Sequence, residues 1–228
     1  MAEQPISGRI SDIFCSIQGE GIYVGIEQVF VRFYGCNLGC AFCDTQPSQY
    51  QRNTPQELLE KIMVFGRGCH SVALTGGEPL LQQEFLANVL RLIKQNGMKV
   101  YLETNGTLYN QLSELIDNLD IIAMDIKLPS SAGGGELWPE HKNFLDIARR
   151  KNVFVKAVIC RSTKLSDIQR AVNILVEVDR NIPFILQPNF PEIGLALINK
   201  IRRFQRFCLN DLSNVRVIPQ MHRLLGLE

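Results

Sequence analysis

The chain has 228 residues, of which 46% are hydrophobic and 21% are charged. This composition excludes a disordered, collagen-like or coiled-coil protein and is typical of a globular domain with a sizeable core. The 24 Lys and Arg residues and the 23 Asp and Glu residues leave a net charge of +1, which excludes the strong positive field of a dedicated nucleic-acid-binding protein. We therefore expect a single domain over residues 1–228 with a small-molecule partner and no direct contact with nucleic acid.

No apolar run approaches the ~20 residues that a membrane-spanning helix needs, and residues 1–8 lack a signal-peptide pattern. These features predict a cytoplasmic protein without a membrane partner. Of the seven cysteines, Cys36, Cys40 and Cys43 lie within one short segment. Clustered thiols in a reducing compartment indicate metal binding rather than disulfides.

Short apolar runs rich in β-branched residues recur along the chain and predict parallel strands that are covered on both faces. These runs are residues 29–34, 71–74, 99–102, 121–125, 153–159, 184–186 and 215–218. Helical patterns lie between them. Thr54 and Glu57 form a capping box, an apolar stripe from Leu81 to Ile93 precedes a stop at Gly97, and Ser166 with Gln169 predicts a second capping box.

The alternation of strands and helices predicts an α/β fold with right-handed crossovers. An open doubly wound sheet and a complete or partial barrel both fit this pattern. Polar and glycine-rich residues follow most of the strands, for example Thr75-Gly76-Gly77-Glu78 and Glu103-Thr104-Asn105-Gly106. Contributions from so many carboxyl ends favour a site at a barrel mouth.

The segment 36–43 reads C-x-x-x-C-x-x-C. A closed zinc site needs four ligands, whereas a cubane iron–sulfur cluster held by three cysteines leaves one iron open to bind another molecule. A structural zinc site completed by a distant residue is the alternative reading. We expect Cys15, Cys69, Cys160 and Cys208 to be packing residues.

This cysteine triplet, followed by Gly76-Gly77-Glu78-Pro79 after the next predicted strand, resembles the radical S-adenosylmethionine (SAM) superfamily. The resemblance implies a partial (β/α)6 TIM-like barrel. It also implies a 4Fe–4S cluster whose open iron binds the amino and carboxylate groups of SAM. In that superfamily the reduced cluster cleaves SAM to methionine and a 5′-deoxyadenosyl radical.

Residues 14–21, Arg32, Asp44-Thr45 and the end of the chain at 219–228 narrow the resemblance to the 7-carboxy-7-deazaguanine synthase family. Those enzymes are lyases of queuosine and 7-deazapurine biosynthesis. They convert 6-carboxy-5,6,7,8-tetrahydropterin to 7-carboxy-7-deazaguanine by radical ring contraction with loss of ammonia. The resemblance implies a 4Fe–4S cluster, SAM and Mg²⁺ as cofactors, a reducing partner such as flavodoxin or ferredoxin, and a homodimer.

The same resemblance implies the site residues. Three segments would build the site: a substrate segment 12–22, a cluster loop 35–46 and a closing tail 214–228. The implied metal ligands are Cys36, Cys40 and Cys43 for the cluster and Thr45 for Mg²⁺. The implied SAM contacts are Phe42, Asp44, Gly76, Gly77, Glu78, Glu103, Asp125, Lys127, Gln187, Asn189 and Phe190. The implied substrate contacts are Ile17, Gln18, Gly19, Glu20, Arg32, Thr75, His222 and Glu228.

Two features depart from the family pattern: Asp125-Ile126-Lys127 stands where some members have Ser-Pro-Lys, and residues 130–135 form an insertion. Two other functions fit parts of the sequence. A glycyl-radical activase shares the cysteine triplet and the GGEP motif but needs a protein-docking surface. A non-catalytic zinc or electron-transfer protein would also use the triplet, and metal analysis distinguishes it from the enzyme.

Overall fold

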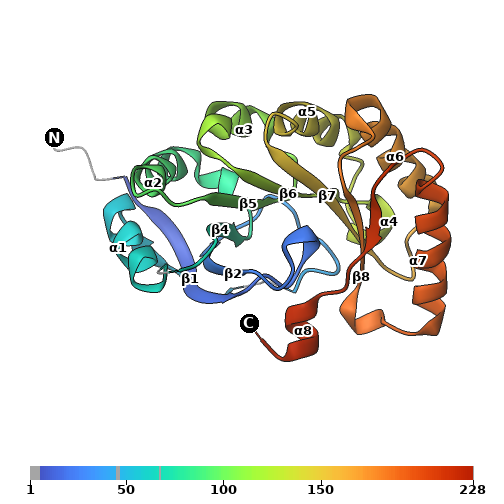
Figure 1. Cartoon of the computed structure of the whole chain (residues 1–228), viewed down its shortest axis with the longest axis horizontal. Coiled ribbons are helices and arrows are strands. Elements are labelled where there is room, and N and C mark those ends of the chain that lie inside the picture. Colours follow the sequence, from blue (N-terminus) through green and yellow to red (C-terminus); the bar gives the residue numbers. More distant parts are fainter. Residues whose placement is uncertain (1–5, 45–46, 67, 228) are drawn as a thin grey trace.

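The computed structural model describes residues 6–44, 47–66 and 68–227, and its strands form one nine-stranded sheet (Figure 1). The strands are β1 (Gly8–Ile17), β2 (Glu27–Phe33), β3 (Gln51–Asn53), β4 (Ser71–Gly76), β5 (Val100–Thr104), β6 (Ile121–Asp125), β7 (Asn152–Ile159), β8 (Phe184–Pro188) and β9 (Val215–Val217). Their order is β3-β1-β2-β4-β5-β6-β7-β8-β9. Strands β2 and β4 to β9 are parallel, whereas β1 pairs antiparallel with both β2 and β3.

The helices α1 to α7 follow the outer side of this sheet, and α8 lies apart from them near the end of the chain (Figure 1). They are α1 (Pro55–Phe65), α2 (Gln83–Gln95), α3 (Tyr109–Leu115), α4 (Pro129–Ala132), α5 (Trp138–Ala148), α6 (Leu165–Asp179), α7 (Leu195–Cys208) and α8 (Met221–Leu225). Short 3-10 turns are η1 (Gly21–Tyr23), η2 (Pro79–Gln82), η3 (Ile116–Asn118) and η4 (Phe190–Glu192). Neighbouring long helices pack against one another in the order α1, α2, α3, α5, α6 and α7.

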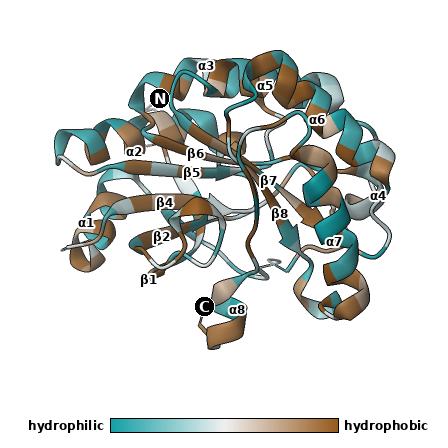
Figure 2. Ribbon diagram, turned by 45° about the vertical axis from the view of Figure 1, so that its right-hand side comes forward, coloured by the Kyte–Doolittle hydropathy of each residue, from teal (hydrophilic) through white to brown (hydrophobic). Residues whose placement is uncertain are grey.

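Each face of the sheet buries its own apolar cluster. The larger cluster joins the helices to the sheet and includes Val31, Leu74 and Phe144. The smaller cluster includes Phe30, Tyr101 and Phe154, and η1 packs onto it through Tyr23. Figure 2 shows the resulting pattern, in which brown apolar faces of the helices alternate with teal polar faces. Burial on both sides is the physical reason that these strands read as near-continuous apolar runs.

All seven predicted strands are present, and the sheet is open, so the partial barrel is confirmed. β1 and β3 were not predicted. In β1 only Gly8 and Ile10 are buried, and polar residues such as Ser11 and Asp12 interrupt its apolar pattern. This strand is defined by its pairing with β2 rather than by its composition.

The helix signals were correct in two places and wrong in one. The Thr54 hydroxyl accepts the Glu57 N–H at 3.3 Å and the Glu57 carboxylate accepts the Thr54 N–H at 2.7 Å, which confirms the capping box. Gly97 has a φ of 72° after α2, as expected of a helix stop. The predicted capping box at Ser166 is wrong, because α6 begins one residue earlier, at Leu165. The residue before the helix, Lys164, instead donates its N–H to the hydroxyl of Ser130 in α4 at 2.9 Å.

None of the helices within the described ranges is long and apolar enough to cross a membrane.

Candidate active site

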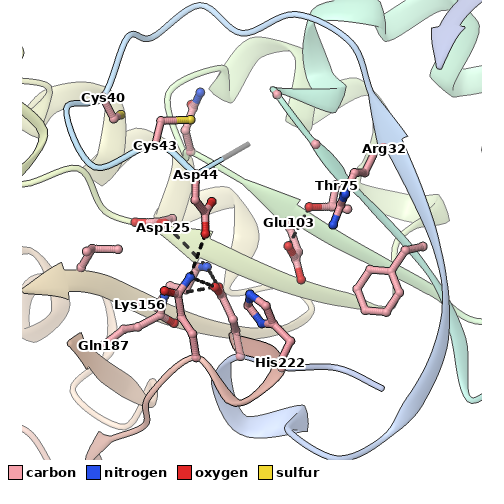
Figure 3. A pocket seen from close by; sticks show the side chains of 18 of the residues that line it. Arg32, Cys40, Cys43, Asp44, Thr75, Glu103, Asp125, Lys156, Gln187 and His222 are labelled. Carbon is pink, nitrogen blue, oxygen red and sulfur yellow. Dashed lines mark hydrogen bonds and ion pairs between the residues drawn. The ribbon is translucent and has the colours of Figure 1, made fainter. Parts of the chain in front are cut away.

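A cavity of about 640 Å³ lies at the carboxyl ends of the parallel strands, where the loops that follow β2, β4, β5, β6 and β8 meet. Its walls combine residues from the whole length of the chain, from Ser11 to Leu227. Figure 3 shows Cys40 and Cys43 on one side of this cavity, Arg32 and Thr75 on the other, and His222 between them. The polar residues that follow the strands thus line a cavity at the mouth of the partial barrel, which makes this mouth the candidate site.

The cysteine loop forms one wall, with Cys36 and Cys43 exposed and Cys40 half-buried. The end of β5 supports it: the Asn105 side-chain amide donates to Asn37 Oδ1 at 2.8 Å and to Cys36 Sγ at 3.9 Å. The Asn37 amide in turn donates to the Thr107 hydroxyl at 3.0 Å. These contacts hold the first cysteine against the sheet and leave all three thiols along one side of the cavity.

Two glycines bring the end of β4 against the start of the cysteine loop. Gly76 has a φ of 115°, and Gly77 and Glu78 donate their backbone N–H groups to the carbonyls of Phe33 and Gly35, each at 2.9 Å. A Cβ on Gly77 would lie 1.9 Å from the Gly35 carbonyl oxygen, so a larger residue would push the loop away. Both glycines also line the cavity.

The segment 130–135 supports the other side of the cysteine loop. The carbonyl of Ala132, in α4, accepts the N–H of Ala41 at 2.8 Å. Ser131 and Thr163 share a hydrogen bond of 2.6 Å between their hydroxyls, and Ser130 donates to the Asp167 carboxylate. The segment 130–135 therefore connects the cysteine loop to the start of α6.

Glu78 is fully buried and lies behind the cavity wall. Its carboxylate accepts hydrogen bonds from Leu80 N–H at 3.1 Å, Asn105 N–H at 2.8 Å and the Thr104 hydroxyl at 3.0 Å. Burial raises the pKa of Glu78 to about 7, although these donors oppose the shift. This side chain connects the ends of β4 and β5, and its expected contact with the ammonium group of SAM stays a prediction.

Asp125 and Lys127 form a charged pair beside the cysteine loop. The Lys127 ammonium lies 2.9 Å from Asp125 Oδ2 and 5.2 Å from the centre of the Phe42 ring. Burial opposes the charge of Lys127, but Asp125 and Cys40 favour it more strongly and raise its pKa. The buried His141 ring packs below: its Nε2 lies 3.2 Å from the Asn105 carbonyl and 3.4 Å from the Lys127 amide nitrogen.

Glu20 lies at the centre of a second polar network. Its carboxylate forms an ion pair with Lys156 and accepts hydrogen bonds from the amides of Gln187 at 3.1 Å and Gln220 at 2.8 Å. Burial opposes the negative charge, yet Lys156 lowers the pKa of Glu20 well below its usual value. Gln220 also donates to Asp44, which joins the cysteine loop to the tail.

A third network lies on the side of the cavity that holds Arg32. The Gln18 amide donates to Glu103 Oε1 at 2.8 Å, and the Thr75 hydroxyl donates to Glu103 Oε2 at 2.7 Å. Glu103 was expected to contact SAM. The structure instead places its carboxylate against Gln18 and Thr75, which are both expected to contact the substrate. The Arg32 guanidinium lies 4.8 Å from the centre of the Phe14 ring, and no described carboxylate forms an ion pair with it.

The tail packs against the segment 12–22. The Met221 N–H donates to the Gly19 carbonyl at 2.8 Å, and the His222 ring packs so closely on Gly19 that a Cβ there would lie 2.1 Å from Nδ1. His222 and Leu227 both line the cavity. Thr45 and Glu228, the expected magnesium ligand and terminal clamp, lie outside the described residues.

Comparison with known proteins identifies the family. Residues 30–181 match the family model of the radical SAM superfamily. The 7-carboxy-7-deazaguanine synthase of Geobacter sulfurreducens is 36% identical over 244 residues, which cover 96% of this chain and 97% of the relative. The chain belongs to the 7-carboxy-7-deazaguanine synthase family. The synthase of Methanothermobacter thermautotrophicus is 33% identical over 243 residues, with 96% and 97% of the two chains covered.

Solved structures share the fold of this synthase family. The crystal structure of QueE from Escherichia coli has a TM-score of 0.67 at 22% identity and covers 95% of both chains. A structure of TYW1 with a lysine-pyruvate adduct bound has a TM-score of 0.60 at 18% identity and covers 83% of this chain and 76% of that one. Both likenesses concern the fold.

The cavity fits the cofactors of a radical SAM synthase, a 4Fe–4S cluster and SAM. Three thiols along one wall are soft ligands suited to iron and leave one iron of a cubane open. Asp125 Oδ1 and Gln187 Oε1 are buried acceptors without a hydrogen-bond partner among the described residues, and both belong to side chains that line the cavity. A bound molecule with N–H or O–H donors would satisfy them.

Most of the expected site residues line this cavity, and Glu78 and Phe190 are the described exceptions. Sequence reasoning assigned no role to Lys156, Gln220 or His141, and it noted Asn105 only as part of the polar stretch 103–106. A signal existed for Lys156, because a lysine within the apolar run 153–159 must be buried with a partner. The partner itself, Glu20, could not be read from the sequence, since it lies 136 residues away.

Proposed function

We propose that this chain converts 6-carboxy-5,6,7,8-tetrahydropterin to 7-carboxy-7-deazaguanine with loss of ammonia. Membership of the 7-carboxy-7-deazaguanine synthase family and a cavity with a thiol wall opposite an arginine support this reaction. The observation that carries the proposal is Arg32, a half-buried cation that lines the cavity and is not paired with any described carboxylate. A carboxylate substrate supplies the missing charge.

One side of the cavity binds the cofactors, and the other side binds the substrate. Cys36, Cys40 and Cys43 hold the cluster, and Asp125, Lys127 and Gln187 face the space for SAM. When bound, the reduced cluster and SAM supply the radical that abstracts a hydrogen atom from the pterin. Arg32 binds the substrate carboxylate through two parallel hydrogen bonds, which fixes the orientation of the ring that contracts.

Other residues of the chain position the substrate and exclude water. Glu103 accepts hydrogen bonds from Gln18 and Thr75. The Glu103 carboxylate and the Thr75 hydroxyl face the N–H groups of the pterin ring. The tail residues His222 and Leu227 cover the cavity and keep water from the reacting atoms. We further propose that Thr45 ligates Mg²⁺ beside the substrate, since a hard cation prefers oxygen ligands.

The resemblance supplies three further parts of the proposal: a flavodoxin or ferredoxin as electron donor, a homodimer, and a cytoplasmic location. Size-exclusion chromatography with light scattering tests the dimer. A Thr45→Ala variant tests the magnesium ligand, because full activity without added magnesium would remove Thr45 from the site.

The deciding experiment is anaerobic incubation of the reconstituted enzyme with reductant, SAM and the carboxypterin, with chromatographic detection of the deazapurine. We expect product from protein that carries about four irons per chain, and none from Cys40→Ala. Cys208→Ala is the matched control, since Cys208, the last residue of α7, is buried in the apolar core and does not line the cavity. Cluster-loaded enzyme that yields no deazapurine would refute the proposed reaction.

A further inference from the structure

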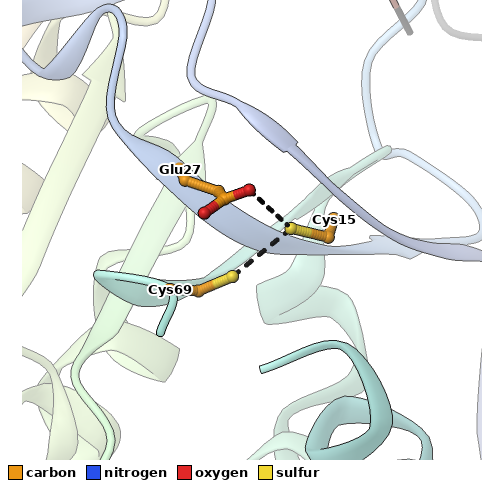
Figure 4. Close-up of side chains that lie close together, drawn as sticks. All are labelled: Cys15, Glu27 and Cys69. Carbon is orange, nitrogen blue, oxygen red and sulfur yellow. Dashed lines mark hydrogen bonds between the residues drawn. The ribbon is translucent and has the colours of Figure 1, made fainter. Parts of the chain in front are cut away.

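Two cysteines outside the cluster loop, Cys15 and Cys69, lie close together where β1 ends and β2 begins (Figure 4). Cys15 Sγ lies 3.3 Å from Cys69 Sγ and 3.6 Å from Glu27 Oε1. One ligand atom from each of the three residues lies within 4.8 Å of the other two, and no other trio of His, Cys, Asp or Glu side chains among the described residues meets that limit. We had expected Cys15 and Cys69 to be packing residues only.

Backbone pairing between the strands brings these three residues together. Cys15 pairs with Val29 and Ile17 pairs with Glu27 across the β1–β2 ladder, so Cys15 and Glu27 are diagonal neighbours on one face of the sheet. Cys69 precedes β4, and the N–H of the next residue, His70, donates to the Glu27 carbonyl at 2.9 Å. The three ligands therefore come from three adjacent strands or strand ends.

The spacing of these atoms suits a single tetrahedral ion. Zinc bonds of about 2.3 Å to sulfur and about 2.1 Å to oxygen place two sulfurs about 3.8 Å apart and a sulfur and an oxygen about 3.6 Å apart. The Cys15–Glu27 distance of 3.6 Å matches the second value, and the two sulfurs at 3.3 Å need to separate by about half an ångström. The Cys69 sulfur and a Glu27 oxygen lie within 4.8 Å, so a rotation of the exposed Glu27 side chain completes the set. A disulfide would instead require the sulfurs to approach to about 2.05 Å.

We propose that Cys15, Cys69 and Glu27 bind one Zn²⁺ ion, with water as the fourth ligand. Glu27 is exposed and both cysteines are half-buried, so the ion reaches the site from solvent. Binding forms two zinc–sulfur bonds and one zinc–oxygen bond, and the two thiol protons pass to water without any change of oxidation state. The bound ion ties the end of β1, which leads into Gln18, to β2 and to the start of β4.

The test measures zinc in the cluster-loaded holoenzyme, whose loop cysteines are then occupied by iron. The protein is equilibrated anaerobically with ZnCl₂ and reductant, passed through a desalting column, and analysed for zinc and iron by mass spectrometry. A chromophoric chelator in competition gives the zinc affinity. We expect one zinc per chain in the wild type and in the matched control Cys208→Ala.

Cys15→Ser and Cys69→Ser should each weaken zinc binding at least 100-fold, and the exposed Glu27→Gln about 10-fold, while the iron content stays unchanged. Zinc should also raise the unfolding temperature of the wild type but not of Cys15→Ser. A wild type that retains no zinc, or retention that is equal in Cys15→Ser and Cys208→Ala, would overturn the site. So would a Cys15–Cys69 disulfide found by peptide mass spectrometry in anaerobically purified protein. Because the readout is zinc, it does not depend on the proposed reaction.

Discussion

The ammonium group of Lys156 in β7 forms an ion pair with the carboxylate of Glu20, which lies 136 residues earlier in the chain. Only 10% of the Lys156 side chain and 15% of the Glu20 side chain is exposed. Asp125 lies 3.7 Å from the same ammonium group. The pair therefore joins the substrate segment to the strand ends beside the cysteine loop. Each charge is buried, and burial of either charge without the other would destabilise the fold.

Loss of one partner of this pair should be costly. We expect Lys156→Met to lower the free energy of unfolding by about 3 kcal/mol, because Glu20 is then buried without its cation. Urea unfolding of the wild type, Lys156→Met, Glu20→Gln and the double variant measures the coupling between the two residues. The double variant should be more stable than Lys156→Met. The pair would not be coupled if Glu20→Gln changed the free energy of unfolding by the same amount in the wild type and in Lys156→Met.

Lys142 provides the matched control, since its pair with Glu177 is exposed on the helices. Lys142→Met should change the stability far less than Lys156→Met does.

Arg32→Lys should raise the KM for the carboxypterin about tenfold, because a lysine ammonium cannot form the bidentate pair of hydrogen bonds that a guanidinium makes with a carboxylate. Steady-state kinetics at saturating SAM measure this change. Arg9→Lys is the control, as Arg9 packs against the rings of Tyr34 and Tyr50 and does not line the cavity. An unchanged KM in Arg32→Lys would exclude Arg32 as the carboxylate ligand.

Gly77→Ala should reduce the iron content of the reconstituted protein to below half that of the wild type. The added methyl group would lie 1.9 Å from the Gly35 carbonyl oxygen and displace the start of the cysteine loop. Gly134→Ala, which meets no atom within 4 Å, should retain full iron content. Iron analysis and the visible absorbance of the cluster provide the comparison, and normal loading of Gly77→Ala would contradict the role assigned to this contact.

His141 should make the protein less stable at acid pH. Burial lowers the pKa of His141 to about 4, so the folded state keeps this ring neutral while the unfolded chain, with a pKa of about 6.5, takes up a proton. The unfolded state therefore binds more protons between these values, and stability is lost as the pH falls from 6.5 toward 4. The loss between pH 7 and pH 5 should be on the order of 2 kcal/mol.

The measurement is urea unfolding of the cluster-free wild type and His141→Gln at both pH values. His141→Gln should lose less stability than the wild type on acidification. The same pH dependence in both proteins would assign the acid sensitivity to other groups.

The sequence alone determined the parallel strands, the capping box at Thr54, the cysteine triplet and the position of the site after the strands. These features are local: an apolar run, a turn or a ligand spacing involves residues that are close in the chain. The resemblance to the family also predicted that Arg32, Thr75 and His222 share one site. All three line the cavity, although 190 positions separate the first from the last of them.

The tertiary structure decided which polar groups are already used and which face the cavity. Glu78 connects two strand ends, Glu103 joins Gln18 to Thr75, and Lys156 pairs with Glu20. It also brought Cys15, near the end of β1, together with Cys69, just before the start of β4. Strand register and burial fix these partners, and both depend on contacts between distant parts of the chain that no local sequence pattern encodes.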